Sequence, residues 1–182
     1  PDDPTLGYKE GPSPRSPEGR AVYAKMVEYM DSRIGKIFNA LDNHGLMDNT
    51  LVVFTSDNGG QVAANNWPLR RSKQWLYEGG IRVPCLMQWP GRIPAGKVSA
   101  APSIMMDASA TLLAAAGALE HVPPGRELDG IDLLPLLQGR SKPGPREFGW
   151  RRRDWDERSH NRMNFLRQEA FRLGDWKLVR SY

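Results

Sequence analysis

The chain has 182 residues, of which 40% are hydrophobic and 25% are charged, a composition that is typical of a globular domain and excludes a disordered protein. It contains no run of 18 apolar residues, which excludes a membrane-spanning helix. The net charge of +4 is uneven, because residues 140–182 carry 12 basic and 6 acidic side chains while residues 1–139 carry 13 and 15. The basic residues are interspersed with acidic ones and form no nucleic-acid reader motif. This segment therefore indicates an anionic small substrate or a solvated face, and not nucleic acid.

The first predicted element is a long helix that follows an irregular, proline-rich start. Ser16-Pro17-Glu18 combines a hydroxyl N-cap, a proline at the first helical position and an acid in the first turn. Apolar residues then recur every three or four positions as far as Leu41, and Gly45 offers a left-handed end. The pattern predicts an amphipathic helix from about residue 17 to Leu41.

A short apolar strand follows and ends in polar residues. Leu51–Thr55 is a continuous apolar or β-branched run, which predicts a strand buried on both faces in a parallel sheet. Asp57 and Asn58 come directly after it, and ligands of open α/β sheets collect at the carboxyl ends of strands. Their hard oxygen atoms are the donors that Ca²⁺ or Mg²⁺ takes. The alternative is an Asx-Gly turn that only closes the strand.

A cationic loop comes next and offers anion-binding groups. Lys73 can present a point charge to a sulfate or phosphate oxygen, and Arg70 can bind the same anion through two hydrogen bonds or brace the loop. The alternative for Lys73 is an ordinary solvated lysine. His160, in a basic loop farther along the chain, is a further candidate for contact with the substrate.

The remaining pattern predicts further helices and strands of a mixed α/β fold. Cys85 lies within an apolar run with no histidine near it in the sequence, so we interpret it as a small buried hydrophobe and not as a catalytic thiol. The predicted elements are a strand over 81–88, a helix over 104–116, a short apolar segment over 129–137, a charged loop over 139–162, and a hairpin over 169–179 that turns at Gly174-Asp175.

Eight segments of the chain form an ordered set. They are residues 23–31, Asn49 to Gly60, Pro68-Leu69-Arg70, Lys73, Glu78 to Pro84, Trp89-Pro90-Gly91, Asp129 to Asp132, and Gly174 to Leu178. Taken together, these segments closely resemble the sulfatase family of the alkaline-phosphatase-like superfamily, and their order and spacing are similar to the second half of that family across nearly the whole chain.

The resemblance implies a fold and a site. The fold would be α/β, part of an alkaline-phosphatase-like sandwich with a mostly parallel central sheet and flanking helices, and the start of a C-terminal antiparallel hairpin. Residues 1–138 would be the C-terminal half of the catalytic domain, and residues 139–182 a charged loop and a truncated hairpin region. By resemblance, Asp57 and Asn58 complete a Ca²⁺ site and Lys73 binds the sulfate. The glycines that the family commonly has between Arg70 and Lys73 are replaced by Arg71 and Ser72, which is expected to shift the loop or add a substrate contact.

The nucleophile of the family is a formylglycine made within a Cys/Ser-x-Pro/Ala-x-Arg motif, and Cys85 does not match that motif. We therefore expect a fragment of a longer sulfatase that hydrolyses sulfated small molecules or glycans when complete and is inactive alone. The alternatives are a phosphoesterase or phosphoglycerol transferase of the same superfamily, and a non-catalytic module that binds anionic glycans. The family resemblance favours export to a periplasmic, secreted or lysosome-like location, and the oligomeric state is left open.

Overall fold

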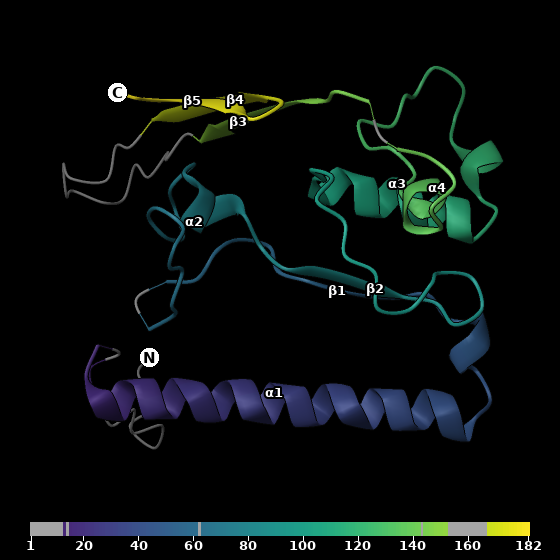
Figure 1. Ribbon diagram of the computed structural model, residues 1–182, viewed down its shortest axis with the longest axis horizontal. Coiled ribbons are helices and arrows are strands. Elements are labelled where there is room, and N and C mark those ends of the chain that lie inside the picture. The colour runs from purple at the N-terminus through teal and green to yellow at the C-terminus, as the bar shows by residue number, and fades with distance from the viewer. Residues whose placement is uncertain (1–12, 14, 62, 143, 153–166) are drawn as a thin grey trace, which may run out of the picture.

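A computed structural model describes residues 13, 15–61, 63–142, 144–152 and 167–182 of the chain. The long helix α1 lies on one side of the strand pair β1–β2, and α3 and α4 lie on the other side, with a separate C-terminal sheet beside them (Figure 1). In chain order the elements are α1 (Pro17–Asn43), the 3₁₀ turn η1 (Met47–Asn49), β1 (Val52–Thr55), α2 (Glu78–Ile81), β2 (Cys85–Gln88), α3 (Met105–Ala115), the 3₁₀ turn η2 (Leu119–His121), α4 (Leu134–Leu137), β3 (Glu147–Arg152), β4 (Gln168–Leu173) and β5 (Trp176–Ser181).

Helix α1 begins and ends as its sequence predicts. The Ser16 side chain accepts a hydrogen bond from the backbone amide of Gly19 over 3.1 Å, which satisfies one of the free amides of the first turn. At the other end Gly45 has a φ of 63°, and the amide of Leu46 donates to the carbonyl of Leu41 over 2.8 Å. This six-to-one bond around a left-handed glycine closes the helix two residues later than predicted.

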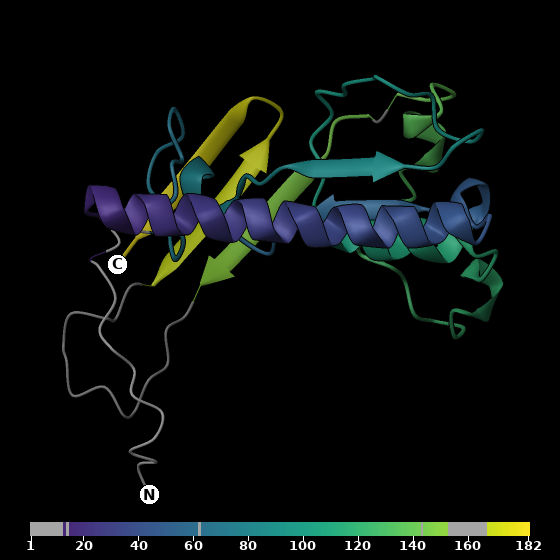
Figure 2. The ribbon, with the colours of Figure 1, turned by 90° about the horizontal axis from the view of Figure 1, so that it is seen from below.

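The apolar stripe of α1 is less covered than its amphipathic pattern predicts. Met26 is 64% exposed and Ile37 is 60% exposed, whereas Ile34 and Phe38 are half-buried. Seen from below, α1 crosses the whole width of the molecule in front of the strand pair (Figure 2). Two four-residue strands are too small to cover a helix of 27 residues, so most of the stripe faces outward in the described part of the chain.

Strands β1 and β2 pair antiparallel, with Val52 opposite Gln88 and Thr55 opposite Cys85. The parallel neighbours predicted for β1 are not among the described residues, and β1 is half-buried instead of buried on both faces. The predicted strand over 81–88 is also shorter, because residues 78–81 form one helical turn and β2 begins only after Pro84, which cannot donate to a strand ladder. Cys85 is exposed on this outer pair, so its predicted burial is wrong.

The C-terminal strands form one antiparallel sheet in the order β3-β4-β5. The hairpin predicted around Gly174 is confirmed, with a φ of 57° at that glycine. Strand β3 corrects the prediction of a charged loop, since its residues alternate between one face that includes buried Phe148 and another that carries charge. On the charged face, Arg151 pairs across the strands with Glu169 at 3.1 Å.

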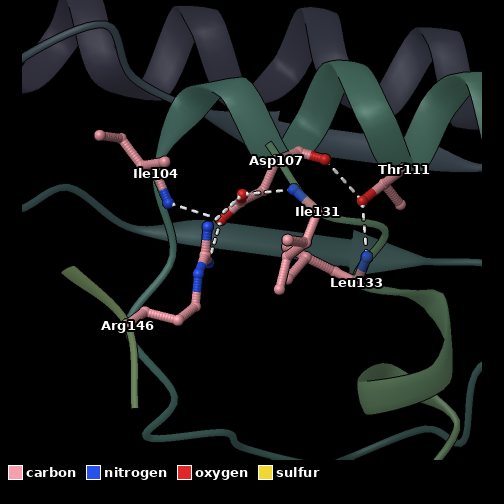
Figure 3. Close-up of polar contacts among 6 residues, drawn as sticks. All are labelled: Ile104, Asp107, Thr111, Ile131, Leu133 and Arg146. Carbon is pink, nitrogen blue, oxygen red and sulfur yellow. Dashed lines mark hydrogen bonds and ion pairs between the residues drawn. The ribbon is translucent and has the colours of Figure 1, made fainter. Parts of the chain in front are cut away.

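A buried carboxylate joins α3 to the segment before β3. Asp107 is fully buried and accepts two 2.7 Å hydrogen bonds from the guanidinium of Arg146 (Figure 3). It also accepts 2.9 Å bonds from the backbone amides of Ile104 and Ile131. Burial alone raises the pKa of Asp107, but Arg146 and the two amides together outweigh that effect and hold the pKa below its usual value.

A second polar residue of α3 continues this connection. The Thr111 hydroxyl donates to the carbonyl of Asp107 over 2.6 Å and accepts from the amide of Leu133 over 2.9 Å. Gly130 lies so close to α3 that a Cβ atom there would come within 2.1 Å of the Met106 carbonyl oxygen.

Among the described residues, none of the helices combines the length and the hydropathy that a membrane-spanning segment needs.

Candidate functional site

The candidate metal ligands lie directly after β1. Asp57 is exposed, and no described residue donates a hydrogen bond to its carboxylate or forms an ion pair with it. Asn58 uses its amide nitrogen on the Gly59 carbonyl at 3.3 Å, and its backbone carbonyl accepts a 2.9 Å bond from the Ser56 hydroxyl. These bonds occupy donors and the backbone, so the side-chain oxygens of Asp57 and Asn58 are available to a ligand.

Close backbone contact joins this turn to α2. The amide of Gly59 donates to the carbonyl of Gly80 over 2.9 Å, and the amide of Gly79 donates to the carbonyl of Arg70 over 2.8 Å. A Cβ atom at Gly59 would lie 1.9 Å from the Gly79 oxygen, and one at Gly79 would lie 2.1 Å from the Arg71 oxygen. Three backbone segments, at Gly59, at Arg70 and Arg71, and at Gly79 and Gly80, therefore pack at a separation that only glycine permits.

A backbone hydrogen bond holds Lys73 close to the candidate metal ligands Asp57 and Asn58. Its amide donates to the carbonyl of Gly60 over 3.0 Å, two residues beyond Asn58. The side chain of Asn66 fixes the same glycine from the other side, accepting from the Gly60 amide at 3.0 Å and donating to its carbonyl at 2.8 Å. The sequence predicted Lys73, but it gave no signal for Asn66 beyond an amide in a polar loop.

Arg70 and Arg71 extend over aromatic rings of the same loop. The guanidinium carbon of Arg70 lies 4.3 Å from the centre of the Tyr77 ring, and that of Arg71 lies 4.3 Å from the centre of the Trp75 ring. The two rings are themselves 6.2 Å apart. The ammonium of Lys73 is exposed and has no partner among the described residues.

The C-terminal sheet supports this loop from behind. Gln168, which is fully buried in β4, accepts a 3.0 Å hydrogen bond from the amide of Leu76 and donates to the Ser181 hydroxyl over 2.9 Å. Lys177 of β5 forms a 2.7 Å ion pair with Glu78 of α2. Sequence reasoning missed both supports, because each joins residues more than 90 positions apart.

The donor chemistry of Asp57 and Asn58 fits a hard cation such as Ca²⁺, since both side chains offer oxygen atoms. The part of the chain that the structure describes holds no group of three or more His, Cys, Asp or Glu residues placed to bind a metal.

Two other residues considered in the sequence are not placed in the site. His160 lies outside the described residues. Partial burial raises the pKa of the Cys85 thiol, although Thr55 acts in the opposite direction, so this thiol is poorly suited to be a nucleophile.

Comparison with known proteins decides the family. Residues 2–118 match the model of the family described as Sulfatase, and residues 70–182 match the model described as N-sulphoglucosamine sulphohydrolase, C-terminal. The chain belongs to the sulfatase family. The predicted resemblance is confirmed, and the sulfatase chain is a member of a family of sulfuric ester hydrolases.

Individual sulfatases align with most of this chain. It is 40% identical to the steryl-sulfatase of Mus musculus over 137 residues, which is 70% of this chain and 22% of that protein. It is 42% identical to the N-acetylgalactosamine-6-sulfatase of Homo sapiens over 133 residues, which is 69% of this chain and 25% of that protein. The sulfatase chain thus spans about a quarter of the length of these curated relatives.

Solved structures confirm the alkaline-phosphatase-like α/β fold. Ps i-CgsB, in complex with k-i-k-neocarrahexaose, superposes with a TM-score of 0.74 and 35% identity over 91% of this chain and 35% of that chain. The PsFucS1 sulfatase from Pseudoalteromonas sp. superposes with a TM-score of 0.58 and 30% identity over 79% of this chain and 27% of that chain.

Proposed function

We propose that this sulfatase chain supplies part of the Ca²⁺ and sulfate-binding machinery of a complete sulfatase and that the nucleophile comes from outside these 182 residues. One observation carries the proposal. Two backbone hydrogen bonds, from Gly59 to Gly80 and from Lys73 to Gly60, bring the Asp57 turn and the Lys73 loop together. The side chains of Asp57 and Lys73, which have no partner among the described residues, are left for ligands.

The candidate residues would act in two ways, as oxygen ligands for Ca²⁺ and as a positive charge for the sulfate. Asp57 and Asn58 would hold Ca²⁺ through their side-chain oxygens. When bound, Ca²⁺ supplies positive charge that offsets the charge on the oxygens of a sulfate ester. Lys73 would add a second positive charge, and the bond from its amide to Gly60, which holds its backbone beside the turn that carries Asp57, supports this role. The chain orients the sulfate group and neutralises its charge.

We propose a sulfated glycan as the substrate class. A named relative is an N-acetylgalactosamine-6-sulfatase, and the structural neighbour Ps i-CgsB is complexed with an oligosaccharide. The exposed cations of residues 70–73, two of which lie over the half-buried rings of Trp75 and Tyr77, support the same class, because sulfate groups pair with cations.

Calcium titration of the 182-residue chain tests the metal half of the proposal. With two protein ligands we expect a dissociation constant on the order of millimolar. Asp57→Asn should weaken Ca²⁺ binding by at least about tenfold. Asp48→Asn removes the same charge from an exposed residue before β1 and serves as the matched control. Equal affinities for the two variants would overturn the metal assignment.

Aryl ester binding in saturating Ca²⁺ tests the sulfate half. We expect p-nitrophenyl sulfate to bind more tightly than p-nitrophenyl phosphate, and Lys73→Ala to weaken the sulfate on the order of tenfold. A preference for the phosphate would favour a phosphoesterase instead.

Sequencing upstream of the codon for Pro1 tests the source of the nucleophile, since we expect a Cys/Ser-x-Pro/Ala-x-Arg motif in the same reading frame.

A further inference from the structure

Arg71 adopts a backbone conformation that an arginine rarely adopts. Its φ is 68°, in the left-handed region that favours glycine, and Gln74 three residues later has a φ of 77°. A non-glycine residue in this conformation is strained and persists only where its surroundings enforce it. Here the Arg71 carbonyl oxygen packs against Gly79, so the loop is fixed in place while the Arg71 side chain extends outward.

The side chain of Arg71 is oriented but not neutralised. Its guanidinium carbon lies 4.3 Å from the centre of the Trp75 ring, so the ring constrains the guanidinium. No described residue accepts a hydrogen bond from this guanidinium or pairs with its charge. With its carbon over the ring and its N–H groups without a partner among the described residues, this guanidinium can bind a sulfate or carboxylate through two hydrogen bonds.

Arg71 is also close to the candidate sulfate site. It is two residues from Lys73, so their Cα atoms are at most about 7 Å apart. Both cations therefore leave the backbone within the same short stretch of loop, but only Lys73 is tied through Gly60 to the turn that carries Asp57. A single sulfate bound by Lys73 leaves the charge of Arg71 available to another anionic group.

We propose that Arg71, held by Trp75, forms a second anion-binding subsite that selects glycans with a further sulfate beside the one bound at Lys73. This inference rests on the proposed function and narrows its substrate class to multiply sulfated glycans. Because Trp75 already orients the guanidinium, binding the second sulfate requires little further ordering of the Arg71 side chain.

Arg71→Gly is an unusually clean test, since glycine suits a φ of 68° and removes only the side chain. The measurement is the ratio of two affinities for the 182-residue chain in Ca²⁺, that for a multiply sulfated heparin hexasaccharide and that for N-acetylgalactosamine 6-sulfate. We expect Arg71→Gly to reduce this ratio on the order of tenfold.

Two matched controls separate the subsite from simpler effects. Gln74→Gly relieves the same kind of backbone conformation without changing charge, and Arg126→Gly removes an exposed arginine in a distant turn. Both should keep the wild-type ratio. If either control lowers the ratio as much as Arg71→Gly does, the proposed subsite is overturned, because loop strain or overall charge would account for the effect.

Lys73→Ala distinguishes failure of the subsite from failure of the proposed function. It should weaken both sugars together. If it does so while Arg71→Gly keeps the wild-type ratio, the subsite is wrong and the sulfate site stands. If Lys73→Ala changes neither affinity but Arg71→Gly lowers the ratio, the proposed role of Lys73 fails, and Arg71 is an anion-binding residue but not a second subsite beside a sulfate at Lys73.

Discussion

The backbone amide of Leu76 donates a 3.0 Å hydrogen bond to Oε1 of Gln168, a residue 92 positions later in the chain. The bond is buried, and it joins the loop that carries Lys73 to the middle strand of the C-terminal sheet. The sheet is therefore part of the support of the candidate site.

Removing this bond should destabilise the chain. Gln168→Ala leaves a buried amide without its acceptor, which costs about 1 to 3 kcal/mol. We expect that loss in the free energy of unfolding, measured by urea denaturation. Gln61→Ala, at an exposed glutamine, should change the same quantity by less than about 0.5 kcal/mol. Equal losses in the two variants would contradict the role assigned to Gln168.

A methyl group at Gly79 should disrupt the loop junction. Its Cβ would lie 2.1 Å from the Arg71 oxygen, and because that oxygen belongs to backbone the clash cannot be relieved by a side-chain rotation. We expect Gly79→Ala to lower the free energy of unfolding by about 3 kcal/mol. Gly35→Ala is the control, since nothing lies within 4 Å of that site in α1 and alanine should stabilise the helix by about 0.5 to 1 kcal/mol.

Removing Arg146 should leave a buried charge unpaired. Asp107 is fully buried, and Arg146→Met deletes both of its 2.7 Å bonds from the guanidinium, so we expect a loss of about 3 to 5 kcal/mol. The double variant with Asp107→Asn should recover part of that loss, because it removes the unpaired charge. Thermal unfolding of the wild type and the two variants measures the recovery, and no recovery in the double variant would show that packing, not charge, dominates.

The same carboxylate should make stability depend on acid pH. The pKa of Asp107 is lowered in the folded chain, so its contribution to stability is complete above the ordinary carboxyl pKa of about 3.9 and is lost as the pH falls through the folded value. The stability difference between wild type and Asp107→Asn should therefore shrink below about pH 4. Urea denaturation from pH 3 to 7 measures it, and a constant difference would refute the linkage.

Cys85 should behave as an unactivated thiol despite its exposure. Its raised pKa reduces the thiolate fraction at neutral pH, and thiolate is the reactive form. We expect iodoacetamide to modify Cys85 more slowly than free cysteine at pH 7, with a rate that keeps rising at pH values where the rate for free cysteine has already levelled off. Faster modification than free cysteine would identify an activated thiol.

Local signals in the sequence predicted much of the fold. Helix α1, its caps at Ser16 and Gly45, and the hairpin at Gly174 depend on neighbouring residues, and the structure confirms them. The helical turn at Glu78 and the strand β3 escaped prediction because contacts with distant segments decide them. The C-terminal sheet gives β3 its partner, and close packing of Gly79 and Gly80 shapes the turn.

The candidate site divides in the same way. Asp57, Asn58 and Lys73 were predicted from residue type and position, and the structure brings their backbones together. Asn66 and Gln168 act through hydrogen bonds to backbone amides, which leave no pattern in the sequence. The left-handed φ of Arg71 was likewise invisible in a polar loop, although the residue itself was singled out as a substitution for glycine.

The bond between Leu76 and Gln168 also sets the smallest piece of this chain that is worth engineering. A version ending before β4 would keep every residue proposed to touch calcium or sulfate, yet it would lack Gln168 and Lys177, the two supports of the loop. Those last two strands belong in any transplant of this site into another scaffold, even though no atom of theirs is proposed to meet the ligand.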